Sequence, residues 1–195
     1  MNFTPPSRDF GGYLFDCDGT VIDSMPIHYA GWDYAAKKVG IALDFPKSLY
    51  ESLAGTATTK IVEILNEMQG LSMDPLEISE IKREYYLANL DQLTVIPEVA
   101  DYAKRVAETR PVAIVTGGAR KIVTQSLEAV GLLDLFRVIV TYEDVPNGKP
   151  APDMFLLAAE MIGVEPSECL VIEDGVLGIE GADAAGMSSV LLPAL

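Results

Sequence analysis

The sequence predicts an α/β fold, with a parallel five-stranded sheet, helices on both of its faces, and further helices inserted after the first strand. Short apolar runs alternate with helical patterns over the second half of the chain, as in a Rossmann-like core. The stretch from residue 24 to about 90 is patterned for helices alone. With 195 residues and 49% hydrophobic content, the chain suffices for one full core and a small second domain. We therefore expect a core domain of residues 1–23 and 93–195 and a helical domain of residues 24–92.

The core strands are expected where apolar runs are bounded by turn residues. The first of them is Gly11–Phe15, and the others are Pro111–Thr116, Val138–Thr141, Cys169–Ile172 and Ser189–Leu192. The helices between them are expected at Pro97–Thr109, Ala119–Val130, Pro152–Ile162 and Gly175–Ala185. Pro152 suits the first position of its helix, and Asp153 suits the positive end of the helix dipole.

The inserted region shows helical spacing without a convincing strand. Its expected helices are Pro26–Val39, Thr58–Met68 and Pro75–Leu90, and the chain returns to the core near Leu93–Pro97. Three or four helices placed together in this way predict a subdomain of their own.

Two carboxylates, Asp16 and Asp18, follow the first strand directly in the run Asp-Cys-Asp-Gly-Thr. Two like charges about 4 Å apart repel by roughly 4 kcal/mol at an effective dielectric constant of 20. A cation or a bound proton should offset this repulsion, which favours a metal-assisted active site. The alternative is an ordinary Asp-Gly turn that carries a second aspartate.

Polar residues also follow the later strands, and the carboxyl ends of parallel strands share one edge of the sheet. Thr116-Gly117-Gly118 offers a hydroxyl and free N–H groups for a phosphate, or forms a plain strand-to-helix connection. Lys149 suits a phosphate or the Asp16 charge, or is a solvated loop lysine. Glu173 and Asp174 suit Mg²⁺, or cap the following helix.

The composition narrows the class of partner. The net charge of −15 and the isoelectric point of about 4.3 argue against nucleic acid and against anionic membranes. The two cysteines, Cys17 and Cys169, do not suggest a disulfide framework, and the first ten residues lack the apolar region of a signal peptide. We expect a cytoplasmic protein, monomeric by default at this size.

Four segments in order, FDCDGT, VTGG, GKPAPD and VIEDGVLGIEGADAAGM, resemble the four signature motifs of the haloacid dehalogenase superfamily. The resemblance covers essentially the whole chain. The two-aspartate form of the first motif is that of the phosphotransferase branch, and the insertion resembles the small α-helical cap of the family. The group resembled comprises β-phosphoglucomutase-like proteins and small sugar phosphatases, including fructose-1-phosphatase-like enzymes.

The resemblance implies a mechanism. Asp16 would be the nucleophile that forms an aspartyl-phosphate, and Asp18 would serve as general acid and then general base. Mg²⁺ would be held by Asp16, by Asp174 and by the backbone carbonyl of Asp18, with Glu173 nearby. Thr116 and the Gly117 N–H would bind phosphate oxygens of a small sugar phosphate, and Lys149 would neutralise developing charge.

Hydrolysis and isomerisation would use this same core. Mutase caps of the family carry basic residues around a glycine-containing segment that corresponds to Leu53–Thr58, where this chain has none before Lys60. The segment therefore favours a phosphatase over a β-phosphoglucomutase-type isomerase. A signalling receiver module is a third alternative, against which the long insertion and the Asp-x-Asp pair both argue.

Contacts with the rest of the substrate are harder to assign. The candidates are His28, Trp32, Gly55, Thr56 and Arg120. His28 and Trp32 lie one turn apart on one helix face, where a packing role is the alternative. Lys82 and Arg83 are expected on a solvated face, with contact to the substrate as the alternative.

Overall fold

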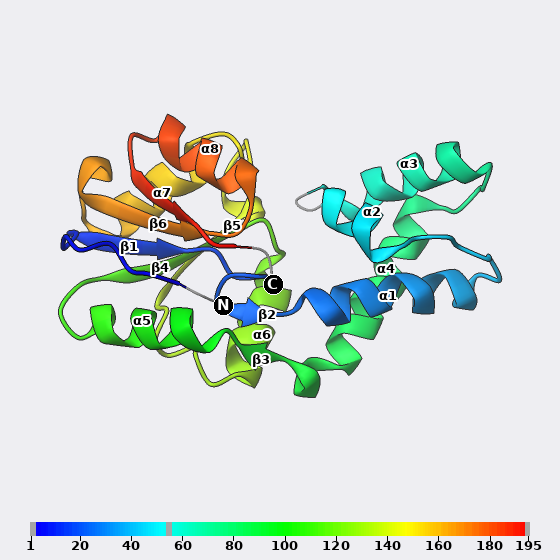
Figure 1. Cartoon of the computed structure of the whole chain (residues 1–195), viewed down its shortest axis with the longest axis horizontal. Coiled ribbons are helices and arrows are strands. Elements are labelled where there is room, and N and C mark those ends of the chain that lie inside the picture. Colours follow the sequence, from blue (N-terminus) through cyan, green and yellow to red (C-terminus); the bar gives the residue numbers. More distant parts are fainter. Residues whose placement is uncertain (1–2, 54–55, 194–195) are drawn as a thin grey trace. The chain divides into compact units, whose positions relative to one another are not determined.

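A computed structural model of the chain describes residues 3–53 and 56–193. The chain divides into two compact units, each described here by itself (Figure 1). The core unit comprises Met1–Asp23 and Leu93–Leu195, and the helical unit comprises Ser24–Gln92.

The core unit contains the expected parallel sheet of five strands in the order β5-β4-β1-β6-β7. The strands are β1 (Gly12–Phe15), β4 (Val112–Thr116), β5 (Val138–Thr141), β6 (Cys169–Glu173) and β7 (Ser188–Leu191). Every residue of β1, β4 and β6 is buried, as in a sheet covered on both faces. The α/β prediction is confirmed, with strand ends within about a residue of those expected.

Two helices cover each face of this sheet (Figure 1). One face carries α5 (Pro97–Ala107) and α6 (Arg120–Ala129), and the other carries α7 (Asp153–Ile162) and α8 (Val176–Ala184). Short 3₁₀ turns lie at η2 (Tyr142–Asp144) and η3 (Pro166–Glu168). Pro152 was expected inside α7, but it is the residue before the helix, and Asp153 is the first helical residue.

The alternation of side chains along β1 divides the core into two halves. Phe15 packs edge-on against Phe136 and Tyr102 on one side, with ring centroids 5.7 and 6.3 Å apart. Leu14 points to the other side, where it joins a buried cluster with Met154 and Phe155 of α7. Packing on both faces therefore fixes the position of β1, and the residues directly after β1 start from a well-fixed strand end.

A second, very small sheet was not expected from the sequence. It pairs β2 (Ile22–Asp23) with β3 (Thr94–Val95) in antiparallel fashion, and the Ile96 N–H extends it by donating to the Val21 carbonyl. The chain leaves and re-enters the core unit through these two paired segments.

The helical unit consists of four helices and a 3₁₀ turn among its described residues. They are α1 (Met25–Lys38), α2 (Lys47–Ser52), α3 (Thr58–Gln69), α4 (Pro75–Ala88) and η1 (Leu90–Gln92). Trp32, Leu65 and Ile78 lie in the core of this unit. None of the helices described for this chain combines the length and apolar character that crossing a membrane requires.

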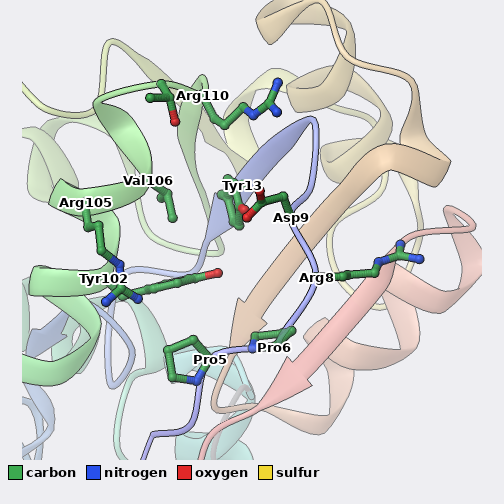
Figure 2. A pocket seen from close by; sticks show the side chains of 10 residues that line it. Pro5, Pro6, Arg8, Asp9, Tyr13, Tyr102, Arg105, Val106 and Arg110 are labelled. Atoms are coloured by element: carbon green, nitrogen blue, oxygen red, sulfur yellow. The ribbon is translucent and has the colours of Figure 1, made fainter.

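A cavity of about 270 Å³ lies at the amino ends of β1 and β4, between the N-terminal segment and α5 (Figure 2). Arg105 and Arg110 stand on its rim, and Arg8 turns toward Phe10 and the Ser188 hydroxyl. The polar groups predicted to act together follow the carboxyl ends of the strands, so this cavity is not part of that site.

Candidate active site

Three carboxylates meet at the carboxyl ends of the neighbouring strands β1 and β6. Asp16 follows β1, Glu173 ends β6, and Asp174 comes next. The Asp16 N–H donates to the Ile172 carbonyl at 2.9 Å, which continues the pairing of the two strands into the site. One oxygen from each carboxylate lies within 4.8 Å of the others.

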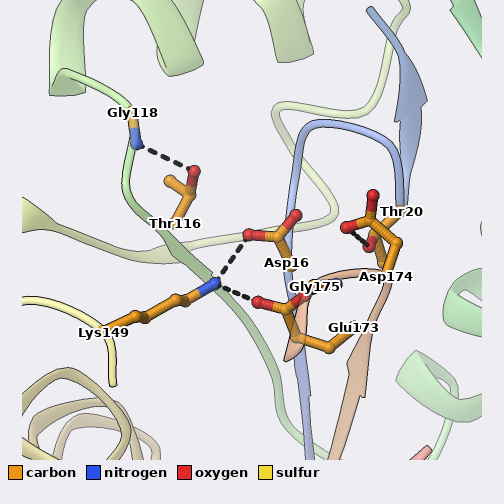
Figure 3. A network of polar contacts seen from close by, with 8 residues as sticks. All are labelled: Asp16, Thr20, Thr116, Gly118, Lys149, Glu173, Asp174 and Gly175. Carbon is orange, nitrogen blue, oxygen red and sulfur yellow. Dashed lines mark hydrogen bonds and ion pairs between the residues drawn. The ribbon is translucent and has the colours of Figure 1, made fainter. Parts of the chain in front are cut away.

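Lys149 reaches this cluster from the loop between β5 and α7 (Figure 3). Its Nζ lies 2.7 Å from Asp16 Oδ1 and 2.6 Å from Glu173 Oε1. Burial opposes the charged form of the amine, but the carboxylates of Asp16 and Glu173 outweigh it and raise the pKa of Lys149. The ammonium is therefore a fixed positive charge between two buried acids.

One ammonium does not offset three carboxylates. Burial raises the pKa of Asp16 well above its usual range, Lys149 opposes this, and Glu173 and Asp174 add to the rise. Burial and the neighbouring Glu173 also raise the pKa of Asp174, to about 6. The ionised forms of these acids thus oppose one another, and a bound cation would relieve that repulsion.

The donor set fits such a cation. Carboxylate oxygens are hard ligands of the kind that Mg²⁺ prefers, and three of them come within reach of one another. Asp16, Glu173 and Asp174 are thus brought together as the sequence suggested. The side chain of Asp18 is not a member of this group, and its predicted ligand was the main-chain carbonyl.

The turn after β1 holds Asp174 in place. Gly19 has φ +82°, a left-handed conformation that favours glycine, and a Cβ there would lie 2.3 Å from Asp174 Oδ2. The Thr20 hydroxyl donates to Asp174 Oδ1 at 3.1 Å. Sequence reasoning missed this role of Thr20, although the residue stands in the Asp-Cys-Asp-Gly-Thr run.

The groups predicted to bind phosphate lie at the end of β4 and directly after it. Thr116 is buried, and its Oγ1 accepts a hydrogen bond from the Gly118 N–H at 3.0 Å. Gly117 between them is exposed. A Cβ on Gly118 would lie 3.7 Å from Asp18 Oδ2, so this turn approaches the Asp18 carboxylate.

The Arg120 side chain has partners within the core unit, and its contact with a substrate stays a prediction. Its guanidinium donates to the Ile139 carbonyl and to the Asp144 carboxylate, and its backbone N–H donates to Glu143. The side chain therefore joins the start of α6 to β5 and η2. Partners so far along the chain leave no local sequence signal.

The candidates in the helical unit are placed as follows. The His28 ring is half-buried and stacks on Tyr86, with centroids 4.5 Å apart. Trp32 is 2% exposed and packs edge-on against Phe45, which leaves its indole little surface for a ligand. Thr56 is half-buried. Gly55 lies outside the described residues.

The expectation of a solvated Lys82 is wrong. Lys82 is 9% exposed, its Nζ donates to the His28 carbonyl at 3.0 Å, and it lies 4.1 Å from the centre of the Trp32 ring. Burial lowers the pKa of Lys82 to about 7. Arg83, the next residue, is exposed and pairs with Glu80, as a solvated face requires.

Clustered carboxylates and a buried lysine at the carboxyl edge of a doubly covered parallel sheet are typical of an enzyme core, because ligands of such sheets bind at that edge. The chain belongs to the haloacid dehalogenase-like hydrolase family, whose model matches residues 11–186. The predicted family membership is thereby confirmed.

Named relatives refine this assignment. The chain is 35% identical over 182 residues to the fructose-1-phosphate phosphatase YqaB of Escherichia coli (strain K12), covering 93% of this chain and 95% of the relative. It matches the crystal structure of a β-phosphoglucomutase from Clostridium difficile at 28% identity with a TM-score of 0.77, covering 93% and 84% of the two chains. The fold also matches CbbY from Rhodobacter sphaeroides in complex with phosphate, at 22% identity with a TM-score of 0.84, covering 95% and 87%. A phosphatase-type enzyme, of the sugar phosphatase or phosphoglucomutase-like kind, is therefore supported.

Proposed function

We propose that the protein hydrolyses small sugar phosphates with the aid of Mg²⁺ and forms an aspartyl-phosphate on Asp16. The observation that carries the proposal is the buried Lys149 ammonium, 2.7 Å from Asp16 Oδ1 and 2.6 Å from Glu173 Oε1. A nucleophilic carboxylate beside a fixed positive charge is what transfer of a dianionic phosphoryl group requires. The sugar phosphate class follows from the fructose-1-phosphate phosphatase relative.

The chemistry divides into two transfers. An Asp16 carboxylate oxygen attacks phosphorus, the bond from phosphorus to the sugar oxygen breaks, and Asp18 donates a proton to that oxygen. Asp18 then takes a proton from water as the water oxygen attacks phosphorus, and the bond to Asp16 breaks to release phosphate. Asp18 ends as it began, protonated. Throughout, Thr116 and the Gly117 N–H bind phosphoryl oxygens, and Lys149 neutralises their charge.

Mg²⁺ would be held by the carboxylates of Asp16 and Asp174 and by the Asp18 carbonyl, with Glu173 nearby. When bound, it supplies positive charge that offsets the acidic cluster and polarises the phosphoryl group.

Isomerisation remains the alternative, because a β-phosphoglucomutase is among the solved relatives. The first basic side chain after Leu53–Thr58 is Lys60, which is exposed and pairs with Glu63 at 2.9 Å. A mutase needs a second cationic binding site for its bisphosphate intermediate. Because Lys60 is already paired with Glu63, no basic side chain among the described residues of this segment offers such a site, which supports transfer to water.

Phosphate release from a panel of hexose and pentose phosphates, with a parallel assay for glucose-1-phosphate isomerisation, tests the proposal. We expect phosphate release that EDTA abolishes and Mg²⁺ restores. Asp16→Asn keeps the side-chain shape but removes the nucleophile, and we expect it to lower the rate by more than about a hundredfold. Asp9→Asn, at the opposite end of β1, is the matched control and should leave the rate unchanged. Substantial activity in Asp16→Asn contradicts the proposal.

A further inference from the structure

The Glu173 carboxylate is the most tightly enclosed acid of the candidate active site. It is 3% exposed, and both of its oxygens are engaged. Oε1 accepts from Lys149 Nζ at 2.6 Å, and Oε2 accepts from the Gly175 N–H at 2.6 Å (Figure 3). Gly175 is the residue before α8, so the carboxylate also lies at the positive end of that helix dipole.

A gap in the side-chain surface of α8 accommodates this carboxylate. Gly178 lies in the first turn of the helix, and a Cβ there would lie 1.8 Å from Glu173 Oε1 and 2.1 Å from its Cδ. The helix does not need a glycine for its backbone at this position, because Gly178 has no positive φ. The absence of a side chain at Gly178 instead leaves space for the Glu173 carboxylate beside the helix.

The alternative role for Glu173 is direct ligation of a metal, since one of its oxygens lies within 4.8 Å of oxygens of Asp16 and Asp174. Two differences between Glu173 and Asp174 distinguish a positioning role from metal ligation. Glu173 shares Lys149 with Asp16 and also binds a main-chain amide, whereas Asp174 is held by the Thr20 hydroxyl and by no cation within 4.0 Å among the described residues. Asp174 is also the more exposed of the two acids.

We infer that Glu173 is a positioning residue that holds the Lys149 ammonium against Asp16, and that Gly178 provides the space this arrangement needs. Lys149 is a long side chain on a loop, and its nitrogen is fixed by Asp16 and Glu173, with the Phe155 ring 5.6 Å away. Without Glu173 the ammonium would keep one acidic partner and gain rotational freedom. The inference rests on the proposed function, in which Lys149 neutralises the phosphoryl oxygens.

Three variants separate positioning from metal ligation. We expect Glu173→Gln and Gly178→Ala each to lower kcat for p-nitrophenyl phosphate by about 10- to 100-fold. Their affinity for Mg²⁺, measured by calorimetry without phosphate, should stay within about twofold of the parent protein. Asp174→Asn should weaken Mg²⁺ binding by about 10-fold or more. A loss of Mg²⁺ affinity in Glu173→Gln as large as in Asp174→Asn overturns the inference.

A control away from the site accounts for packing damage. A Cβ on Gly12, in β1, would lie 2.7 Å from Ile162 Cδ1, a clash without a carboxylate. Gly12→Ala should therefore lower the melting temperature but leave kcat of the folded protein within about twofold. If Gly178→Ala behaves in the same way, with kcat preserved, the inference is wrong.

A double substitution tests whether Gly178 acts through Glu173. Glu173→Ala removes the side chain that an alanine at 178 would displace, so Gly178→Ala should have little further effect in that background. Equal losses in both backgrounds would contradict the inference. Activity retained in Asp16→Asn would refute the proposed function itself, whereas an inactive Asp16→Asn with a fully active Glu173→Gln would refute only the positioning role.

Discussion

At the scale of single residues, Lys82 shows how a fold changes the chemistry of a side chain. Its amine lies between α1 and α4, where the Trp32 ring and the His28 carbonyl replace water. These two contacts favour the ammonium, but burial disfavours it and lowers the pKa of Lys82 to about 7. The charge therefore carries a cost in stability that depends on pH.

This cost has a definite sign. The unfolded chain keeps the Lys82 proton up to about pH 10.4, whereas the folded chain loses it above about pH 7. Between these values the unfolded state binds more protons, so the free energy of unfolding rises with pH, by at most about 1.4 kcal/mol per unit. We expect the free energy of unfolding, measured by urea denaturation, to rise between pH 7 and 9.5 for the parent protein relative to Lys82→Met. The exposed neighbour variant Arg83→Met should show no such trend, and a pH-independent difference for Lys82→Met would contradict the prediction.

At the scale of elements, α4 shows how a helix start is specified. Asp74 precedes the helix, and its Oδ1 accepts from the N–H groups of Leu76 and Glu77 at 2.8 and 3.1 Å. Pro75, which has no N–H to satisfy, takes the first helical position. Together these contacts fix where α4 begins.

We expect Asp74→Ala to lower the free energy of unfolding of the helical unit by about 1 kcal/mol, because two N–H groups lose their acceptor. Asp74→Asn keeps an acceptor oxygen and should retain most of the stability. Chemical denaturation followed by circular dichroism measures both. An alanine variant as stable as the parent would show that the cap contributes nothing.

The sequence predicted the long elements of the core well, because apolar runs such as Val112–Thr116 are distinctive. It could not predict β2 and β3, since two residues are too few for an alternating pattern and the partners lie about 70 residues apart. Asp16, Lys149 and Asp174 were found because strand ends and motif residues coincide. Thr20, Gly178 and the Arg120–Asp144 pair were missed because their roles depend on contacts in space. Lys82 was misjudged because it stands in a run, Glu80–Glu84, in which every residue but Ile81 is charged, as on a solvated face.

At the scale of the whole molecule, charge is the dominant feature. The chain carries a net charge of −15. Three of its acidic residues lie close together in the candidate active site, where they are largely buried. A cation that binds the folded state alone shifts the unfolding equilibrium in proportion to its occupancy. The monomeric state, the cytoplasmic location and the absence of nucleic-acid partners stay predictions.

We expect Mg²⁺ at about 100 times its dissociation constant to stabilise the protein by about 2.7 kcal/mol, seen as a higher melting temperature. Sodium chloride at matched ionic strength is the control, because screening alone also relieves self-repulsion. Asp174→Asn binds Mg²⁺ at least about tenfold more weakly in our expectation, so the same Mg²⁺ concentration should stabilise it by at most about 1.4 kcal/mol. An equal response of the parent protein to both salts would argue against a specific magnesium site.

The placement of β1 beside β6 has a consequence for biosynthesis. A ribosome makes Asp174 about 160 residues after Asp16, yet the two acids come together only when these strands pair. A partly synthesised chain therefore has no functional centre until the β6 segment has emerged and docked. The candidate active site therefore forms only once β6 has paired with β1.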